Sequence, residues 1–348
     1  MIIKVGNKFI GKGCPCFIAA EIGINHNNDM DLALKMIDAA IESGADAVKF
    51  QNYVTEDFIL DKDLSYTYIS GGKSITESQF EMFKRYELTF DQLRFLKEYC
   101  DKKQIIFFST PTSKIGVDEL VKLNVPVLKN GSDLLVNIPL IRYMAKTKIP
   151  VIISTGMATT SEIDDAVRAY EEAYGKELII LHCTSAYPTP DEDVNILKIE
   201  SLSKTFGYPV GYSDHTWGTE AAIASVTLGS CFIEKHFTID KNLPGPDHRF
   251  SADPFELKQL VLSIRKLEKM LGDSKIGPTK SEEFGRFGFR LSCAMSRDIE
   301  KGEMITENDI IFIRPASGLH PRFFEILLGK KSKIPLKRGQ FIRLIDIE

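Results

Sequence analysis

Short, nearly continuous apolar runs recur along the first two thirds of the chain, separated by polar segments with helical periodicity. The runs are rich in β-branched and aromatic residues and do not alternate with polar ones, which is typical of parallel strands covered on both faces. Eight such runs are present, at residues 17–23, 47–51, 105–110, 125–129, 151–155, 178–184, 210–214 and 231–236. The pattern therefore predicts eight buried β-strands.

The intervening segments predict helices. Residues 31–44 carry apolar positions at i, i+3 and i+4 and end at Gly44, a residue that stops helices. The segment after the fifth strand opens with Thr160, a good helix cap. Eight strand–helix units favour an α/β fold of the (β/α)₈ TIM-barrel type. The rival is an open doubly wound sheet, but residues 21–26 (EIGINH) lack its Gly-rich fingerprint.

The pattern changes after residue 272. Residues 273–288 are rich in Gly, Lys and Glu and predict a linker, and residues 289–348 hold short strand-like pieces and tight turns. Within them, residues 299–305 (IEKGEMI) and 336–342 (LKRGQFI) share an apolar-x-x-Gly-x-x-Ile pattern. We therefore expect a catalytic domain at 1–272 and a small, mostly-β domain at 289–348. So small a module needs support from the barrel or from a partner subunit.

Composition and charge exclude several classes of protein. The chain is 43% hydrophobic and 26% charged with a formal net charge of −4, so neither nucleic acid nor an anionic membrane is an expected partner. No apolar run reaches the roughly 18 residues of a membrane helix. Residues 1–13 contain no apolar segment followed by a cleavage site, and the six cysteines are scattered. We expect a cytoplasmic protein with reduced thiols.

Nearly every predicted strand ends in a functional side chain. Barrel enzymes carry their chemistry at these carboxyl ends. A single serine there more often caps a helix, and a single histidine more often satisfies a carbonyl. The concentration at one end is what indicates an active site, because a purely structural barrel has no reason to gather lysines and hydroxyls there. The residues include Glu21, Asn25, His26, Lys49, Gln51, Thr110, Lys129, Ser132, Ser154, Ser185, Tyr187, Ser213, His215, Glu234 and His236.

Two groups can be separated. His215 and His236 end neighbouring strands and can converge on one divalent metal, with Glu21 beside them as ligand or general base. Two imidazoles and a carboxylate suit Mn, Fe, Co or Zn better than Ca. The alternative is a helix-capping His215 and a core His236.

The second group combines two cations with hydroxyl donors and would cradle a phosphate or a carboxylate. It comprises Lys49, Thr110, Lys129, Ser132, Ser154 and Ser213. Lys129 has a rival role, because a strand-end lysine can form a Schiff base, as in barrel aldolases. From the residues alone, the chemistry is carbon–carbon bond formation or hydrolysis involving a phosphorylated metabolite.

At these positions the sequence resembles the bacterial sialic acid synthase family, the phosphoenolpyruvate-dependent nonulosonate synthases. The likeness covers nearly the whole chain. The tail, with residues 313–315 (IRP) and 318–321 (GLHP), looks like that family's antifreeze-like (SAF) domain. The barrel motifs are residues 20–27 (AEIGINHN), 44–51 (GADAVKFQ), 154–157 (STGM), 181–190 (LHCTSAYPTP), 211–215 (GYSDH), 233–238 (IEKHFT) and 244–248 (PGPDH).

The resemblance implies condensation of phosphoenolpyruvate with an N-acetylmannosamine-type sugar and release of phosphate. His215 and His236 would hold Mn²⁺ or Mg²⁺, and Glu21 would be the acid/base. The phosphoenolpyruvate ligands would be the residues of the second group together with Ser185. Gln51, Tyr187 and Asp247 would contact the sugar. Arg314 would reach from the SAF domain into the barrel of the other subunit, which implies a homodimer with swapped SAF domains.

Two departures affect the sugar side. Sialic acid synthases commonly read Gly-Ser-Gly-Glu where this chain has residues 131–134 (GSDL), and a sugar-binding Asn in the loop 53–78, a predicted lid, is replaced around Ser74. An N,N′-diacetyllegionaminate synthase is therefore an alternative to an N-acetylneuraminate synthase, unless Asp133 takes over the lost contact. Alternatives from other classes are a non-catalytic carbohydrate-binding relic and a Schiff-base lyase.

Overall fold

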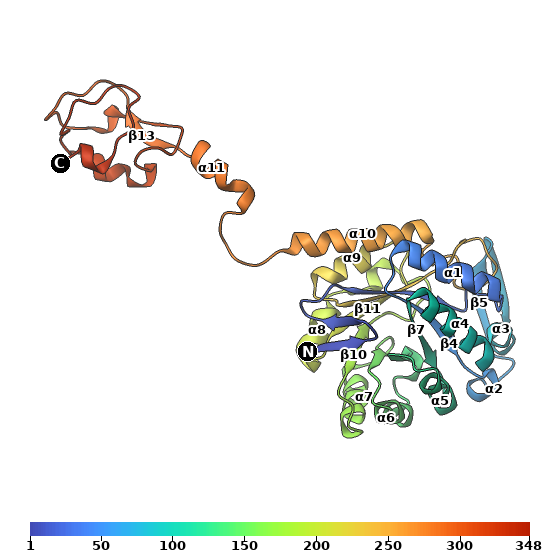
Figure 1. The fold of residues 1–348 in the computed structure, drawn as a ribbon. Coiled ribbons are helices and arrows are strands. Elements are labelled where there is room, and N and C mark those ends of the chain that lie inside the picture. The colour runs from blue at the N-terminus through green and yellow to red at the C-terminus, as the bar shows by residue number, and fades with distance from the viewer. The chain divides into compact units, whose positions relative to one another are not determined.

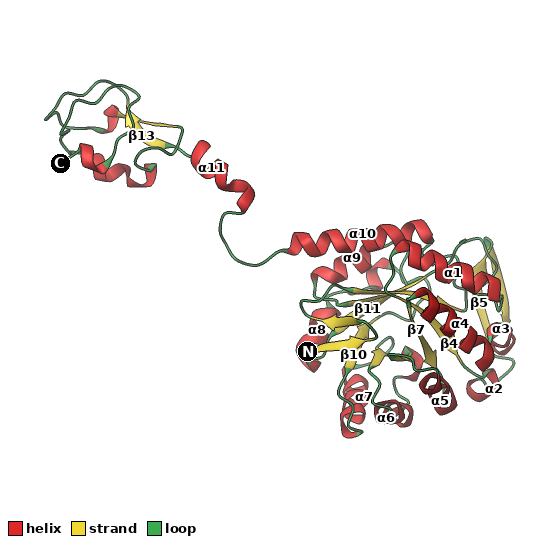
Figure 2. Cartoon of the chain, viewed as in Figure 1, coloured by secondary structure: helices red, strands yellow, loops and turns green.

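The structure is a computed structural model that describes all 348 residues. It divides into two compact units, Met1–Gly272 and Asp273–Glu348. In the first unit, strands lie at the centre and helices surround them (Figures 1 and 2). No helix combines the length and apolar character needed to cross a membrane.

Eight strands form one sheet in the order β7-β4-β3-β12-β11-β10-β9-β8, and every hydrogen-bonded pair is parallel. The end strands β7 and β8 lie next to each other, so the sheet is a nearly closed barrel. This confirms the predicted fold class, and the doubly wound alternative is wrong. The strands are β3 (Phe17–Gly23), β4 (Ala47–Asn52), β7 (Ile106–Pro111), β8 (Leu128–Asn130), β9 (Val151–Ser154), β10 (Leu178–His182), β11 (Val210–Asp214) and β12 (Phe232–His236).

Both faces of these strands are buried, which explains their continuous apolar character. Successive side chains point to opposite faces. One set, including Ile18 and Ile233, packs against the surrounding helices, and the other, including Ile152 and Phe232, fills the barrel interior. Polar residues can therefore replace the interior set only at the ends of the barrel, where a ligand or solvent can reach them.

A hairpin of β1 (Ile2–Val5) and β2 (Lys8–Gly11) closes the amino-terminal end of the barrel. Its residues Ile3, Val5 and Ile10 are fully buried in the interior cluster. Burial of each contributes roughly 1.5–3 kcal/mol relative to exposure. The sequence pattern did not reveal this hairpin, because four-residue strands carry too little periodicity. Because the hairpin covers the amino-terminal end of the barrel, a substrate can enter only at the carboxyl end.

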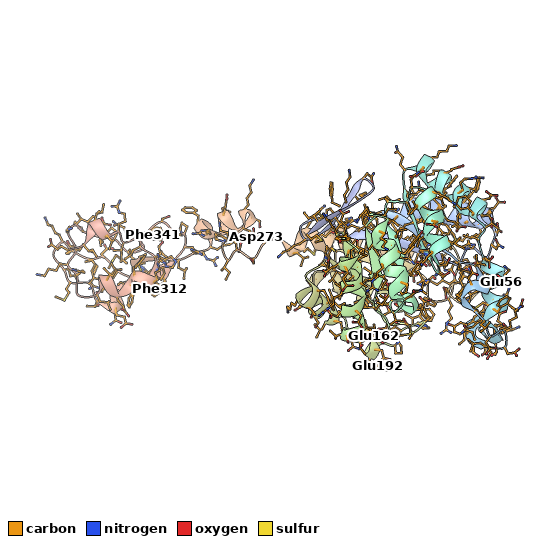
Figure 3. All side chains as sticks on the ribbon, turned by 90° about the horizontal axis from the view of Figure 1, so that it is seen from below. Glu56, Glu162, Glu192, Asp273, Phe312 and Phe341 are labelled. Carbon is orange, nitrogen blue, oxygen red and sulfur yellow. The ribbon has the colours of Figure 1, made fainter.

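Helices cover the outside of the barrel. Helix α1 begins after Asp29, whose carboxylate accepts from the backbone N–H of Leu32, and ends at Gly44 with φ of 87°, as predicted. For α7 the predicted cap is wrong by one residue: Thr159 is the cap, in a reciprocal box with Glu162, which is labelled in Figure 3. The helices are α1 (Met30–Ser43), α4 (Phe90–Lys103), α5 (Lys114–Lys122), α6 (Ile138–Lys146), α7 (Thr160–Glu172), α8 (Lys198–Phe206), α9 (Glu220–Thr227) and α10 (Pro254–Leu271), with 3₁₀ turns η1 (Ser132–Leu134) and η2 (Asp191–Asp193).

The predicted lid after β4 has its own secondary structure. Residues 53–78 contain α2 (Thr55–Phe58) and an antiparallel hairpin of β5 (Ser65–Ser70) and β6 (Lys73–Ser78), and α3 (Gln79–Tyr86) follows directly. Ile24, Tyr53, Met82 and Tyr86 form a separate small core beneath it. The Ser70 hydroxyl accepts from the backbone N–H of Gly245 at 3.1 Å, so the hairpin contacts the loop that follows β12.

The second unit is small and mostly irregular. Its residues 273–288, expected to be a linker, include η3 (Lys280–Glu282) and α11 (Glu283–Gly288). Then come β13 (Ser292–Met295), η4 (Glu307–Asp309), β14 (Ile310–Ile313), η5 (Pro321–Leu327) and η6 (Leu344–Asp346). Two phenylalanines labelled in Figure 3 lie at its strands: Phe341 bridges to Ala294 of β13, and the β14 residue Phe312 packs edge-on against Phe324.

The two similar segments of this unit form its core together. Ile299 and Leu336, the first residues of the two segments, form an antiparallel bridge. Their last residues, Ile305 and Ile342, are fully buried in the same apolar cluster. The shared apolar-x-x-Gly-x-x-Ile pattern thus marks two segments that contribute corresponding residues to one core.

Candidate active site

Three buried charges lie inside the carboxyl end of the barrel. Ala19, Ala47 and Phe232 face the interior, so the residues two positions later, Glu21, Lys49 and Glu234, face it too. Each of these charged residues is at most 4% exposed. Charges this deeply buried require partners, and the surrounding strands supply them.

Lys49 lies between two carboxylates. Its Nζ is 3.1 Å from Oε2 of Glu21 and 3.5 Å from Oε1 of Glu234, and it donates to the Thr110 hydroxyl at 3.1 Å. The amide of Gln51 donates to the other oxygen of Glu21 at 3.1 Å. The predicted cation of the anion cradle and the predicted acid/base are therefore in direct contact.

Glu234 also reaches the other side of the cradle. Its Oε1 accepts from the Ser213 hydroxyl at 2.9 Å and is 4.0 Å from Nζ of Lys129. Lys129 in turn donates to the Ser154 hydroxyl at 2.6 Å. Sequence analysis placed Glu234 at a strand end but gave it no role. The available signal was its position two residues before His236, on the same face of β12.

The protonation of this cluster follows from burial and mutual attraction. Burial opposes charge on Glu234, but Lys129 and Lys49 outweigh it and hold the pKa of this carboxyl below its usual value. For Glu21, burial outweighs the attraction of Lys49 and raises its pKa to about 7. Burial lowers the pKa of Lys129. Glu234 is thus the fixed anion, and Glu21 is the carboxyl able to exchange a proton near neutral pH.

Hydroxyl groups from the next strands complete the cradle. The Ser132 hydroxyl accepts from the backbone N–H of Gly156 at 3.1 Å and lies 3.1 Å from Sγ of Cys183. The Ser185 hydroxyl is buried without a hydrogen-bond partner. A Cβ atom on Gly156 would collide with both hydroxyls. Glycine at 156, a position that sequence analysis did not single out, therefore allows these donors to face one space.

The two predicted metal-binding histidines meet beside this cradle. The ring centroids of His215 and His236 are 5.4 Å apart. Nδ1 of His215 is 2.7 Å from the carbonyl oxygen of Thr184, and its Nε2 is 3.4 Å from the Ser213 hydroxyl. Nδ1 of His236 is buried without a hydrogen-bond partner. Burial lowers the pKa of His215 to about 4 and that of His236 well below its usual value, so both imidazoles are neutral.

These features fit a divalent metal. Neutral imidazoles are metal ligands, and an orphaned buried nitrogen is expected where a ligand atom awaits its ion. No group of three or more His, Cys, Asp or Glu side chains is arranged to hold a metal on its own. The protein would therefore supply two nitrogens and leave other coordination positions to substrate or water, as catalytic sites do.

Asp247 and Tyr187 border the histidines. Oδ2 of Asp247 is 3.5 Å from Nδ1 of His236, and burial raises the pKa of Asp247 to about 7. The Tyr187 ring lies 4.3 Å from the His215 ring, centroid to centroid. Tyr187 is 44% exposed and so stands at the mouth of the site.

The loop of Asp247 is held by the first loop of the barrel. The amide of Asn25 donates to the Phe237 carbonyl and to the Ser251 hydroxyl, both at 2.9 Å. Ser251 donates to the backbone carbonyl of Asp247 at 2.6 Å. The amide of Asn27 donates to the Pro244 carbonyl at 2.9 Å. The motif at residues 20–27 thus positions Asp247 as well as carrying Glu21.

Arg314 is the one predicted site residue that does not belong to the barrel unit. It lies at the end of β14 in the second unit, is exposed, and places its guanidinium over the Phe289 ring, 5.5 Å from the centroid. The remaining predicted residues gather at the carboxyl end of the barrel.

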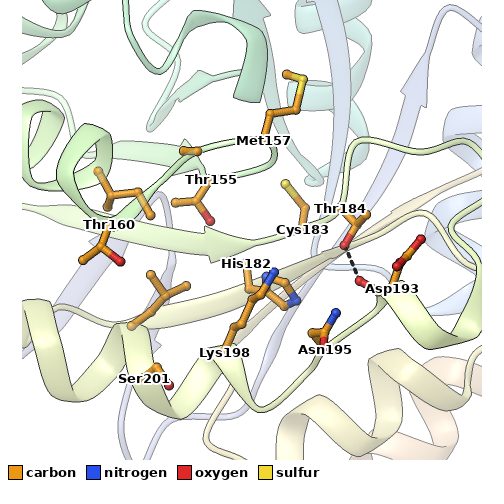
Figure 4. Close-up of a pocket in the computed structure, with 13 residues that line it drawn as sticks. Thr155, Met157, Thr160, His182, Cys183, Thr184, Asp193, Asn195, Lys198 and Ser201 are labelled. Carbon is orange, nitrogen blue, oxygen red and sulfur yellow. Dashed lines mark hydrogen bonds between the residues drawn. The ribbon is translucent and has the colours of Figure 1, made fainter.

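A separate pocket of about 470 Å³ lies at the carboxyl ends of β9 and β10 and is also lined by residues of α7 and α8. His182, Lys198 and Asn195 are among the side chains that line it, as Figure 4 shows. Its lining contains none of the predicted site residues. Nε2 of His182 is already 2.7 Å from the Val194 carbonyl oxygen, and none of the charged residues Glu21, Lys49, Lys129 and Glu234 lines this pocket.

A barrel whose open end joins an anion cradle to a pair of neutral imidazoles and a titrating carboxyl has the parts of a metal-assisted carbon–carbon bond-forming enzyme. Comparison with known proteins gives the family. The model of the NeuB family matches residues 36–276, and the SAF domain model matches residues 293–348.

Whole-length relatives agree. The chain is 39% identical to the N,N′-diacetyllegionaminic acid synthase of Legionella pneumophila, covering 99% of this chain and 98% of that protein. It is 36% identical to a pseudaminic acid synthase of Campylobacter jejuni, over 99% of this chain and 100% of that protein. The solved N-acetylneuraminic acid synthetase of Leptospira borgpetersenii superposes with a TM-score of 0.74 at 37% identity, over 82% of this chain and 95% of that one.

The chain belongs to the NeuB family of phosphoenolpyruvate-dependent nonulosonate synthases and carries the C-terminal SAF domain. It is therefore a transferase of nonulosonate biosynthesis, and the non-catalytic and Schiff-base alternatives lose their support.

Proposed function

We propose that this enzyme condenses phosphoenolpyruvate with 2,4-diacetamido-2,4,6-trideoxymannose to give an N,N′-diacetyllegionaminate-type product and phosphate. The observation that carries the choice of sugar is Leu134. Where sialic acid synthases commonly place a sugar-binding Glu, this residue packs against the outer core of the barrel. A site without that carboxylate favours an acceptor that lacks a hydroxyl to pair with it, since an unpaired polar group loses free energy on burial.

The anion cradle would bind phosphoenolpyruvate. Lys49 and Lys129 supply positive charge on two sides, and the unpartnered Ser185 hydroxyl is free to donate. Hydrogen bonds from charged donors to phosphate are stronger than neutral ones. The remaining donors of the cradle are Thr110, Ser132, Ser154 and Ser213.

The sugar aldehyde would lie between this cradle and the histidines. His215 and His236 would hold Mn²⁺ or Mg²⁺, which when bound polarises the aldehyde carbonyl as a Lewis acid. Gln51, Tyr187 and Asp247 border the same space and would orient the sugar.

The reaction joins the methylene carbon of phosphoenolpyruvate to the aldehyde carbon of the sugar. Water supplies the oxygen of the new keto group, and phosphate leaves. The aldehyde oxygen becomes a hydroxyl and needs a proton. Glu21, whose pKa burial raises to about 7, can hold this proton in its carboxyl while Lys49 and Gln51 keep the group in place.

N-acetylmannosamine, giving N-acetylneuraminate, is the second candidate acceptor. Asp133 is exposed at the rim, and its charge adds to the effect of burial in raising the pKa of Tyr187. Its carboxylate could replace the missing Glu. The 37% identity to the Leptospira synthetase is consistent with this candidate.

An acceptor panel distinguishes the two candidates. The purified enzyme, phosphoenolpyruvate and Mn²⁺ are incubated with either sugar, phosphate release is timed, and the product mass is determined. We expect a higher kcat/KM for the diacetamido sugar, and equal or faster turnover of N-acetylmannosamine would refute that choice. EDTA and His236→Ala should each abolish phosphate release, and retained activity in either case would refute the metal-assisted reaction.

We further propose that the active site is completed by Arg314 from a second copy, in a homodimer with swapped SAF domains. Its supports are the exposure of Arg314 and the small core of the second unit. Mixing inactive His236→Ala and Arg314→Ala subunits after mild dissociation tests this. Return of activity indicates sites shared between chains, and persistent inactivity indicates that each chain builds its own site.

A further inference from the structure

A second buried ion pair lies directly behind the two histidines. Asp214 and Lys235 are register partners on the neighbouring strands β11 and β12, and Nζ of Lys235 is 2.9 Å from Oδ2 of Asp214. Their side chains are 0% and 1% exposed. Each partner directly precedes an imidazole in the sequence, His215 or His236. By strand alternation the pair points toward the helices while the cradle residues beside it point inward.

The pair is closely enclosed by hydrogen bonds. Oδ1 of Asp214 accepts from the backbone N–H of Thr216 at 2.9 Å and from its hydroxyl at 2.8 Å. Lys235 donates to the Thr216 carbonyl at 2.7 Å. The ion pair therefore ties the end of β12 to Asp214 and Thr216, the two residues that flank His215.

Regular strand pairing ends at this point. The last register pair of β11 with β12 is Asp214 with Lys235, so His215 lies beyond the ladder. Nδ1 of His236 has no hydrogen-bond partner. Buried ion pairs often add little stability over apolar residues of the same shape. Stability alone is thus a weak reason for a full charge pair here.

We propose that Asp214 and Lys235 are positioning residues that set the spacing of the His215 and His236 imidazoles for a divalent metal ion. The inference rests on the metal role proposed above and concerns only the chain's own residues. Changes of this kind behind metal ligands typically weaken metal binding about 10–100-fold. If the Asp214–Lys235 pair served only to stabilise the fold, its removal would change thermal stability and leave the metal affinity unchanged.

The test compares metal affinity with thermal stability in the full-length protein. Mn²⁺ is titrated without phosphoenolpyruvate, free Mn²⁺ is followed by electron paramagnetic resonance, and the unfolding midpoint is measured without metal. Asp214→Asn leaves the Lys235 charge unpaired and should lower both the midpoint and the affinity. The double variant Asp214→Asn/Lys235→Met removes both charges, and we expect it to regain much of the midpoint while Mn²⁺ binding stays about 10–100-fold weaker.

A matched control comes from the opposite end of the barrel. The Asp46 side chain is 8% exposed, pairs with Arg265 at 3.0 Å and accepts from the backbone N–H of Ile18. Asp46→Asn should lower the unfolding midpoint and leave the Mn²⁺ dissociation constant unchanged within error. This separates general loss of stability from loss of metal geometry.

Wild-type affinity in the double variant would overturn the proposal. Should the double variant fail to fold, Thr216→Val removes one hydroxyl bond to Asp214 at nearly constant volume. We then expect weaker Mn²⁺ binding together with a small fall in the midpoint from the lost hydrogen bond, and an unchanged dissociation constant would overturn the proposal. A wild type that binds Mn²⁺ no better than His236→Ala would refute the metal site itself and this inference with it.

Discussion

Replacing Glu234 by Gln keeps the shape of the side chain and removes the anion that two lysines share. Oε1 of Glu234 is 3.5 Å from Nζ of Lys49 and 4.0 Å from Nζ of Lys129. The variant retains an oxygen that can accept from Ser213. The change therefore isolates the charge of Glu234 from its packing.

The expected size follows from these distances. With an effective dielectric constant of about 20, unit charges at 3.5 and 4.0 Å attract by roughly 4–5 kcal/mol each before any compensation. Deprotonation of Lys129, whose pKa is already lowered by burial, would relieve part of the loss. Breaking a buried pair typically costs about 3–5 kcal/mol. At about 2 °C per kcal/mol for a domain of this size, the midpoint should fall by roughly 6–10 °C.

Phosphate should reverse this loss, because an anion bound in the cradle supplies the missing negative charge. The assay is thermal unfolding of wild type and Glu234→Gln with and without inorganic phosphate. We expect a larger phosphate-induced rise in the variant. Asp46→Asn, at the other end of the barrel, should be destabilised without this extra rise. An unchanged midpoint in Glu234→Gln, or equal phosphate shifts in all three proteins, would refute the reasoning.

Three further predictions concern single features. Gly156→Ala places a Cβ against the Ser132 hydroxyl. It should raise the KM for phosphoenolpyruvate about tenfold or more, which corresponds to a loss of roughly 1.4 kcal/mol of binding free energy. An unchanged KM would show that the hydroxyls do not face the substrate. Burial lowers the pKa of His248 to about 4. As the pH drops below about 6.5, this histidine is therefore protonated in the unfolded chain but not in the folded one, and the free energy of unfolding falls until the pH approaches 4. His248→Gln should reduce the difference in urea midpoint between pH 7 and pH 5, and an identical difference would contradict this. Asn25→Ala frees the loop of Asp247 and should lower kcat with a small change in the KM for phosphoenolpyruvate, while a selective change in that KM would place its effect in the cradle instead.

The fold was predictable because its signal is local and repeated. Stretches such as 151–153 and 178–181 are apolar at every position, which is typical of parallel strands covered on both faces. Because the strand–helix unit repeats eight times, a closed barrel was the simplest fold to predict. The β1–β2 hairpin was missed for the opposite reason, since its short strands become recognisable only when Ile3, Val5 and Ile10 meet the barrel floor.

The residue types of the candidate site could be predicted from the sequence, but the contacts between them could not. Strand ends in parallel register share one rim, so Glu21, Lys49 and His236 could be placed together from the sequence. Which charge pairs with which depends on barrel curvature. That curvature makes Glu234 a shared partner of Lys49 and Lys129 and places Gly156 beneath the Ser132 and Ser185 hydroxyls.

By itself, the sequence determined the eight strands of the barrel, the end of the barrel at which the candidate site lies, and the residue types gathered there, because periodicity and strand order are properties of the chain. Only the tertiary structure decided that Asp214 and Lys235 form a buried pair behind the histidines, that Leu134 is half-buried against the core, and that Asn25 supports the loop of Asp247. These contacts join residues far apart in the chain or on different strands, and their distances exist only once the barrel has closed.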